Sequence, residues 1–242
     1  MENDIKNTQS RTDYDVQQDQ QLRRLLAAQD DVWRIFRVMA EFVDGFTLMA
    51  KQKNLVSVFG SARLTPDSHY YQLAVQVSKE LVKHGFNVLT GGGPGIMEAA
   101  NKGAQEQKGN SVGVAIELPH EEDANQYIDR GRLQTFRHFF VRKVMFVKYA
   151  HGFVVMPGGF GTLDEFFEAM TLIQTKKTKE FPIILMGSDY WKGLVDWIKT
   201  TIVQELMISP GDINLFHVTD DPVEAAEIIE DFYKKNVMIT NF

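Results

Sequence analysis

The sequence predicts an α/β protein built on a doubly wound, mostly parallel sheet with an N-terminal helical extension. From residue 55 onward, short apolar runs alternate with stretches of helical periodicity, which is typical of strands joined by crossover helices. The runs are apolar on both faces, as expected for strands that lie between two layers of helices. Hydrophobic residues make up 44% of the 242-residue chain, which is enough for a full core.

The N-terminal fifty residues precede this alternation. Residues 1–20 are polar and are expected to form a flexible tail. Residues 21–50 are expected to form a helix, because large apolar side chains recur there at spacings of three and four. The apolar face of this helix is broad, so it must pack on the main domain or on a second subunit, and the sequence leaves both options open.

Residues 53–236 are expected to form the main domain. Strands are predicted, in chain order, at 55–59, 86–89, 111–116, 152–156, 181–186 and 214–218. Helices are predicted at 66–84, 94–107, 139–150, 162–174, 190–207 and 222–234. Residues 119–138 interrupt the alternation as a long polar loop, and loops of this length are often functional.

Composition excludes several classes of function. The chain has no cysteine, so disulfides, thiolate metal sites and cysteine nucleophiles are ruled out. The net charge of -6 argues against nucleic-acid binding. No apolar run approaches the ~20 residues of a membrane span, and the first residues lack the apolar core of a signal peptide. The histidines lack metal-ligand spacing, so neither a metal nor an organic cofactor is expected, and the protein is expected to be cytoplasmic.

Glycine-rich turns follow three of the predicted strands, at the sheet edge where open parallel sheets bind ligands. One such turn is common between any strand and helix. Three turns at one edge predict nucleotide binding, because glycine lets the backbone approach a phosphate and the next helix offers unpaired N–H groups. The candidate substrate-binding residues are Gly60, Ser61, Gly91, Gly92, Gly93, Gly95, Met97, Gly158, Gly159, Phe160, Gly161 and Thr162.

Known fingerprints do not fit these turns. None of these turns carries the G-x-G-x-x-G dinucleotide pattern, the Walker A loop or the G-x-S-x-G nucleophile elbow. Glu117 nevertheless lies near the end of a strand, where a dinucleotide fold would hold a ribose. An NAD-dependent enzyme therefore stays open as a third alternative.

Charged residues close to these turns are candidates for the chemistry. Arg142 and Lys143 lie one turn into the predicted helix at 139–150, and a guanidinium binds phosphate through paired hydrogen bonds. Glu165 lies three residues beyond Thr162, beside Asp164. Favourable interaction with the helix dipole would explain acids in a first turn, but Glu165 can also face the mouth of the turn. Asp164 and Lys143 are candidate substrate contacts, and Arg63 and Thr171 are weaker candidates.

These motifs together resemble the LONELY GUY (LOG) family. The resemblance rests on residues 91–100, on Arg142 and Lys143, and on P-G-G-x-G-T-x-x-E, matched in full from Pro157 to Glu165, and it covers about residues 53–235. It implies a Rossmann-like fold, a homodimer or larger oligomer, and hydrolysis of the N-glycosidic bond of nucleoside 5'-monophosphates such as AMP or cytokinin nucleotides. The catalytic pair of the family corresponds to Arg142 and Glu165.

The sequence also departs from the plant-type pattern of that family. It has Pro94, Gly95 and Glu98 within the second turn and an acidic loop at 117–123, so the base preference is not inherited. Related proteins are labelled possible lysine decarboxylases, but nothing in this sequence supports a pyridoxal-phosphate enzyme. The alternative is a non-catalytic nucleotide-binding or carrier module, which would not need both Arg142 and Glu165.

Overall fold

A computed structural model describes residues 13–118 and 124–235, with side chains from residue 31 onward. The chain divides into two compact units, the first ending at Phe42 and the second beginning at Val43. The first unit contains most of a single helix, and the second contains the whole sheet.

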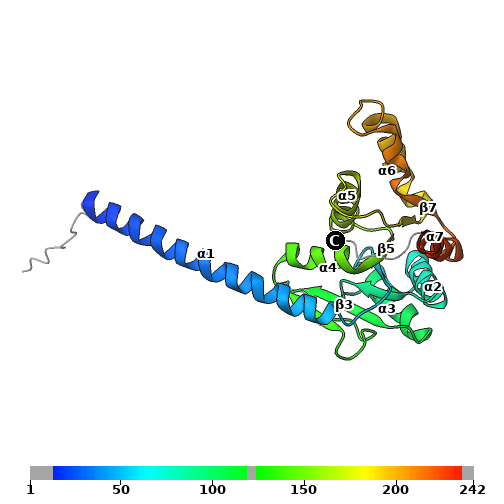
Figure 1. Cartoon of the computed structure of the whole chain (residues 1–242), viewed down its shortest axis with the longest axis horizontal. Helices are drawn as coiled ribbons and strands as arrows, with labels where there is room; N and C mark the ends of the chain where they lie inside the picture. Colours follow the sequence, from blue (N-terminus) through cyan, green and yellow to red (C-terminus); the bar gives the residue numbers. More distant parts are fainter. Residues whose placement is uncertain (1–12, 119–123, 236–242) are drawn as a thin grey trace, which may run out of the picture. The chain divides into compact units, whose positions relative to one another are not determined.

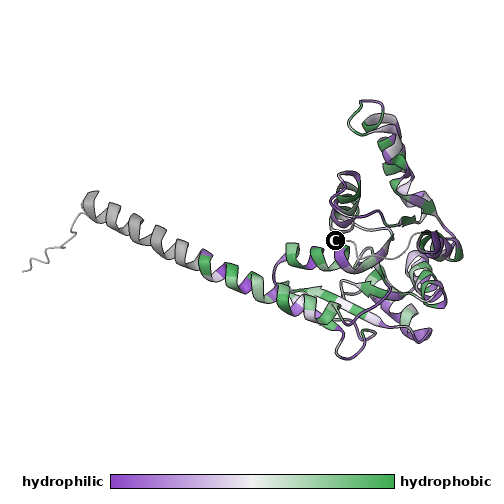
Figure 2. Ribbon diagram, in the orientation of Figure 1, coloured by the Kyte–Doolittle hydropathy of each residue, from purple (hydrophilic) through white to green (hydrophobic). Residues whose placement is uncertain are grey.

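The long helix α1 (Asp13–Met49) begins earlier than the predicted residue 21. Residues 13–20, assigned to the flexible tail, are helical, since they contain no glycine or proline and carry aspartates that suit a helix N-terminus. Residues 1–12 lie outside the described residues. Apolar and polar residues alternate along α1 from residue 31 onward (Figure 2). Its exposed large apolar side chains are Val32, Trp33, Ile35, Phe36, Met39 and Val43.

The C-terminal end of α1 packs on the sheet domain. Met49 is fully buried. A Cβ on Gly45 would lie 2.9 Å from side-chain atoms of both Met145 and Phe136, so glycine permits close approach there. Within the second unit, the last turns of the predicted N-terminal helix therefore pack on the chain's own domain.

The expectation of a doubly wound parallel sheet is confirmed. Seven strands, all parallel in the described part of the chain, lie in the order β4-β3-β2-β1-β5-β6-β7. They are β1 (Leu55–Phe59), β2 (Asn87–Thr90), β3 (Ser111–Ile116), β4 (Leu133–Phe136), β5 (Ala150–Val155), β6 (Ile183–Met186) and β7 (His217–Thr219). Strand β1 is central, with Ser57 opposite Leu89 on one side and Phe153 on the other.

The predicted loop at 119–138 contains the edge strand β4, which the sequence analysis missed. Strand β4 pairs with β3 over four positions, from Gly113 opposite Leu133 to Ile116 opposite Phe136. Only Phe136 of this strand is buried. An edge strand of four residues that exposes most of its side chains produces no apolar run, so its sequence looks like a loop.

Helices cover both faces of the sheet (Figure 1). Helices α2 (His69–Lys83), α3 (Ile96–Glu106) and α7 (Pro222–Lys235) share one buried cluster with strand residues such as Val56 and Val154. Helices α4 (Phe139–Tyr149), α5 (Phe160–Gln174) and α6 (Ser188–Trp197) contribute aromatic rings to the core. The ring of Phe59 in β1 lies 4.8 Å from that of Phe146 in α4, and Phe166 in α5 lies 6.4 Å from Trp191 in α6.

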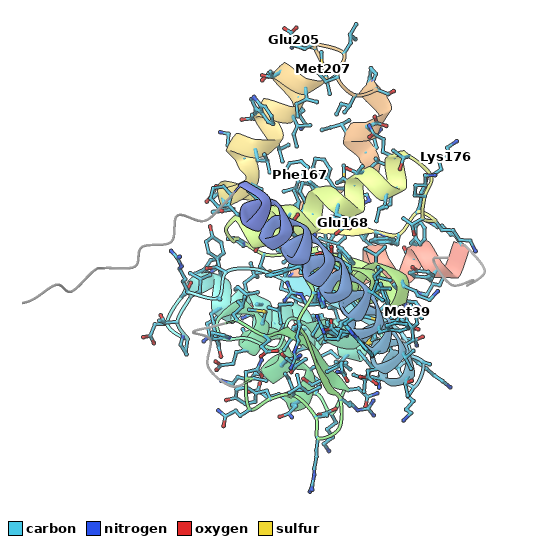
Figure 3. The ribbon with its side chains drawn as sticks, turned by 90° about the vertical axis from the view of Figure 1, so that its left-hand side faces the viewer. Met39, Phe167, Glu168, Lys176, Glu205 and Met207 are labelled. Carbon is cyan, nitrogen blue, oxygen red and sulfur yellow. The ribbon has the colours of Figure 1, made fainter. Side chains whose placement is uncertain are left out.

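The segment after α6 differs from the prediction of one helix over 190–207 and a strand at 214–218. Helix α6 continues as a π-helix (Ile198–Ile202), and Glu205 and Met207 lie at the tip of the segment (Figure 3). A 3-10 helix (Pro210–Leu215) then occupies the predicted start of the strand. A capping box between Ser209 and Asp212, together with Pro210, favours a helical turn at this point.

The strand order places the glycine turns side by side. Strands β2, β1 and β5 are neighbours, so their carboxyl ends meet at one edge of the sheet. The chain leaves β1 toward β2 and leaves β5 toward β6, which makes the gap between β1 and β5 the switch point of the sheet. Ligands of doubly wound proteins bind at such a point.

Candidate functional site

A cleft of about 840 Å³ lies at this switch point. Its walls come from the turns after β1, β2 and β5 and from the first turns of α4, α5 and α6. Most of the residues predicted to form the site line it. These residues are Gly60, Ser61, Gly91, Gly93, Met97, Arg142, Gly158, Gly159, Phe160, Gly161, Thr162 and Glu165, together with the weaker candidate Arg63.

Other predicted residues are placed elsewhere. Gly92, at φ +78°, faces Ile128, and Gly95, at φ +67°, packs so closely on the β1 turn that a Cβ would lie 2.4 Å from the carbonyl oxygen of Ser61. These two glycines shape the turn without lining the cleft. Thr171 donates a hydrogen bond to the Phe167 carbonyl of its own helix. Lys143 and Asp164 pair with each other beside the cleft lining.

The cleft also has lining residues that the sequence analysis did not propose. They are Phe59, Ala62, Leu64, Tyr70, Ile116, Leu118, Phe139, Phe146, Pro157, Leu163 and Tyr190. Leu118 lies two residues after β3 and Tyr190 four residues after β6, so the rule that identified the glycine turns, applied to every strand end, would have found both. The Tyr190 hydroxyl donates to the Gly158 carbonyl oxygen at 2.6 Å and so ties α6 to the turn after β5.

The turn after β5 forms a cradle for an anion. Helix α5 begins at Phe160, and the amides of Thr162 and Leu163 both donate to the Gly159 carbonyl, at 3.0 and 3.1 Å. The earlier amides of a helix have no carbonyl partner within it, and the helix dipole favours negative charge there. A Cβ on Gly158 would lie 2.1 Å from the Thr162 hydroxyl oxygen, so only glycine fits this turn.

The turn after β2 is held from both sides. Asn125 Nδ2 lies 3.0 Å from the carbonyl oxygens of Gly92 and Gly93 and 2.9 Å from Asn101 Oδ1. The Thr90 hydroxyl donates to the same Asn101 oxygen at 2.7 Å and accepts from the Gly92 amide at 3.0 Å. The described part of the segment at 119–138 therefore fixes the wall of the cleft that carries Gly91 and Gly93.

Glu165 is the carboxylate of the cleft. It lies on α5 and is only 4% exposed. Its Oε1 lies 4.0 Å from Arg142 Nη2, and its Oε2 lies 3.5 Å from Lys143 Nζ and has no hydrogen-bond partner among the described residues. Burial raises the pKa of Glu165 to about 7, against the opposing pull of Lys143 and Arg142. This carboxyl can therefore exchange a proton near neutral pH.

Arg142 lies opposite Glu165 between two aromatic rings. Its guanidinium carbon is 5.1 Å from the ring centre of Phe139 and 5.7 Å from that of Phe146. Such stacking orients a guanidinium without neutralising it. A Cβ placed on Gly91 would lie 3.7 Å from Arg142 Nη1, so Arg142 also reaches the turn after β2.

The described residues show two further features that bear on function. They contain no group of three or more histidines and acids arranged to hold a metal ion. None of their helices is both long enough and apolar enough to cross a membrane.

Comparison with known proteins gives one family model and a consistent set of relatives. The model described as possible lysine decarboxylase matches residues 97–229. A rice protein named probable cytokinin riboside 5'-monophosphate phosphoribohydrolase LOGL6 is 24% identical over 192 residues, covering 78% of this chain and 75% of its own. The Arabidopsis thaliana cytokinin riboside 5'-monophosphate phosphoribohydrolase LOG3 is 26% identical, covering 69% and 78%. The pyrimidine/purine nucleotide 5'-monophosphate nucleosidase of Escherichia coli K12 is 28% identical, covering 62% of this chain and 35% of its own.

Solved structures share the fold. The molybdenum cofactor carrier protein of Chlamydomonas reinhardtii superposes with a TM-score of 0.53 at 22% identity, covering 76% of this chain and 99% of its own. The molybdenum cofactor binding protein of Rippkaea orientalis also gives 0.53, at 19% identity, covering 75% and 98%. At this level of identity the likeness concerns the fold alone.

Proposed function

The chain belongs to the LOG family, whose model carries the description possible lysine decarboxylase and spans more than half of it, and on this premise we propose that it is a nucleoside 5'-monophosphate phosphoribohydrolase. The proposed reaction is hydrolysis of the N-glycosidic bond, with release of a free base and ribose 5-phosphate. The relatives named as phosphoribohydrolases and as a nucleotide nucleosidase support this reaction class.

One observation carries the proposal. A buried carboxylate, Glu165, and a guanidinium, Arg142, face each other at 4.0 Å in a cleft that also holds the N-terminus of α5. A binding module needs the helix N-terminus to hold a phosphate, but it gains nothing from burying a carboxylate beside it. Glycosyl cleavage does need a carboxylate, because its transition state resembles an oxocarbenium ion.

Each part of the cleft has a role in the proposed mechanism. The 5'-phosphate is held by the amides at the start of α5, in the turn from Gly158 to Thr162. The nucleoside lies toward Gly91, Gly93 and Met97. As the bond between C1' and the base nitrogen breaks, its electron pair leaves with the base and positive charge develops on the ribose, where the Glu165 carboxylate stabilises it.

Water completes the reaction. Glu165 orients a water molecule and accepts its proton as the oxygen bonds to C1', while the departing base takes up a proton from solvent. Arg142 steadies an anionic part of the substrate or the departing base. It does not act as a proton donor, since the pKa of a guanidinium lies above ~12.

The residues do not fit the decarboxylase description. An enzyme of that kind would bind pyridoxal phosphate through a lysine Schiff base. No lysine lines the cleft in the described part of the chain, and the ammonium of Lys143 is surrounded by carboxylates. We therefore derive no step through that cofactor.

The test of the proposed function is to incubate the purified protein with a panel of nucleoside 5'-monophosphates and to separate the products by chromatography. Release of free base, absent from an Arg142→Ala control, is the expected result. Binding of AMP without base release would replace hydrolysis by a binding or carrier function.

We also infer that the protein forms a homodimer or a larger homo-oligomer. The exposed apolar side chains of α1 support this inference, since such a face is seldom left in water. A cytoplasmic location and the absence of nucleic-acid binding stay predictions from the sequence.

A further inference from the structure

A lysine beside the cleft lies among three carboxylates. Lys143 Nζ is 2.7 Å from Glu168 Oε2, 2.9 Å from Asp164 Oδ2 and 3.5 Å from Glu165 Oε2. The Lys143 side chain is only 14% exposed. Lys143 extends from α4, and the three acids extend from the first three turns of α5 (Glu168 is labelled in Figure 3). One ammonium therefore interacts with three carboxylates.

We propose that Lys143 is a positioning residue that keeps Glu165 ionised and turns its carboxylate toward Arg142, while Asp164 and Glu168 limit this effect by competing for the same ammonium. The inference rests on the proposed function, because it concerns the preparation of the carboxylate that acts in hydrolysis. It assigns Lys143 a role through Glu165 instead of direct contact with substrate.

The geometry separates the two oxygens of Glu165. Oε1 faces Arg142 and the cleft, and Oε2 faces Lys143. At 3.5 Å, the ammonium is farther from Glu165 than from either of the other two acids. The short contacts to Glu168 and Asp164 hold Lys143 in place, and the longer one leaves Oε2 in a purely electrostatic contact. Such an arrangement orients the carboxylate but leaves it able to accept a proton.

The charges around Glu165 determine whether the loss of a neighbouring side chain raises or lowers the pKa of Glu165. Helix α4 contributes Arg142 and Lys143, which favour the ionised form, and α5 contributes Asp164 and Glu168, which oppose it. The remaining ionisable side chains of the cleft lining are Arg63, in the turn after β1, and the tyrosines. Burial opposes the charge of Lys143 itself, but its hydrogen bonds to Glu168 and Asp164 outweigh that and raise its pKa, so it stays a cation.

Removing the cation Lys143 and removing the acid Glu168 should shift the pH profile of hydrolysis in opposite directions. Glu165 acts as an anion, so activity rises as it loses its proton. Lys143→Met should move the acidic limb of kcat/KM to higher pH by about 1–3 units, the effect usual for a close opposite charge. At a pH below the Glu165 midpoints of both wild type and variant, each pH unit of this shift lowers the activity of the variant about tenfold relative to wild type. Glu168→Gln should move the limb to lower pH, and Lys143→Arg, which keeps the charge, should largely restore the wild-type profile.

Comparing the variants with one another removes the contribution that ionisation of the substrate makes to the pH profile. The phosphate of AMP takes up a proton near pH 6, but it does so identically for every variant. A second measurement avoids activity altogether. The infrared band of the protonated Glu165 carboxyl can be identified by its loss in Glu165→Gln, and its titration midpoint followed in Lys143→Met and Glu168→Gln.

The outcomes separate this inference from the proposed function. If AMP is hydrolysed but the acidic limb and the infrared midpoint stay in place in both variants, the role of Lys143 is overturned and hydrolysis stands. If AMP is not hydrolysed but the infrared midpoint moves up in Lys143→Met and down in Glu168→Gln, hydrolysis fails and the electrostatic role stands. If Lys143→Met does not fold, Glu168→Gln decides, and an unmoved midpoint there refutes the inference.

Discussion

Replacing Glu165 by glutamine should strongly lower turnover and stabilise the fold. The side chain keeps its size but loses its charge, so it can neither stabilise an oxocarbenium ion nor take a proton from water. Turnover should fall by roughly 10²–10⁴, the range for a positioned acid or base. This fall alone would not separate catalysis from disturbed folding, so the stability of the same variant is needed.

The pKa of Glu165 gives the magnitude and sign of the stability change. Burial raises this pKa from 4.5 to about 7, and each pKa unit corresponds to about 1.4 kcal/mol. A carboxyl with a raised pKa binds its proton more tightly in the folded state, so folding loses stability as the pH rises from about 4.5 to about 7. Above pH 7, ionised Glu165 costs the fold about 3 kcal/mol, which the glutamine removes.

The assay is thermal melting of wild type and Glu165→Gln at pH 8 and at pH 4.5, with base release measured on the same samples. At pH 8 the variant should melt roughly 5–10 °C higher, and at pH 4.5 the difference should largely vanish. Asp189→Asn is the matched control, since Asp189 is an exposed acid in the first turn of α6. Loss of the Asp189 charge should lower the free energy of unfolding by only about 0.3–1 kcal/mol.

A different outcome would refute the reasoning. If Glu165 served only the dipole of α5, Glu165→Gln would behave like the Asp189 control, with a slightly lower melting temperature and nearly normal base release. That result would leave nucleotide binding as the function of the cleft and would remove the basis for a catalytic carboxylate.

The cleft and α1 support three further predictions. AMP should be hydrolysed far faster than adenosine under equal conditions, because the amides at the start of α5 lose their partner in the nucleoside; equal turnover would contradict the phosphate cradle. Gly158→Ala should lower base release by about 10² or more, since its Cβ would lie 2.1 Å from Thr162 Oγ1, whereas Gly193→Ala, in open space on α6, should leave the rate unchanged. Light scattering at micromolar concentration should give at least a dimer mass, and a monomer mass would disprove the oligomer.

The parts of the site that lie directly after strands were predictable from the sequence. In a parallel sheet the position of a residue relative to a strand end fixes its place at the sheet edge, whatever the details of packing. The glycine turns, Met97 and the first turn of α5 were found in this way. Arg142 lies in the first turn of α4 and Glu165 in the second turn of α5, both at the same edge, so the sequence was enough to propose them.

Other features depend on contacts that sequence spacing does not encode. The cluster around Lys143 forms because a side chain of α4 reaches acids of α5, and neither helix alone indicates which acid the ammonium contacts. Gly92 and Gly95 resemble phosphate-binding glycines in sequence, yet their positive φ and close packing serve the turn itself. Strand β4 has too few buried residues to be distinguished from a loop.

The three turns of the cleft are joined through the main chain of one residue, Ser61. Its amide donates to the Pro157 carbonyl at 3.0 Å, and its carbonyl accepts from the Ile96 amide at 3.0 Å. These bonds do not depend on the side chains of the next two residues, Ala62 and Arg63, which also line the cleft. Positions 62 and 63 can therefore diverge between paralogues, or be randomised in a selection for new bases, while the three turns stay joined.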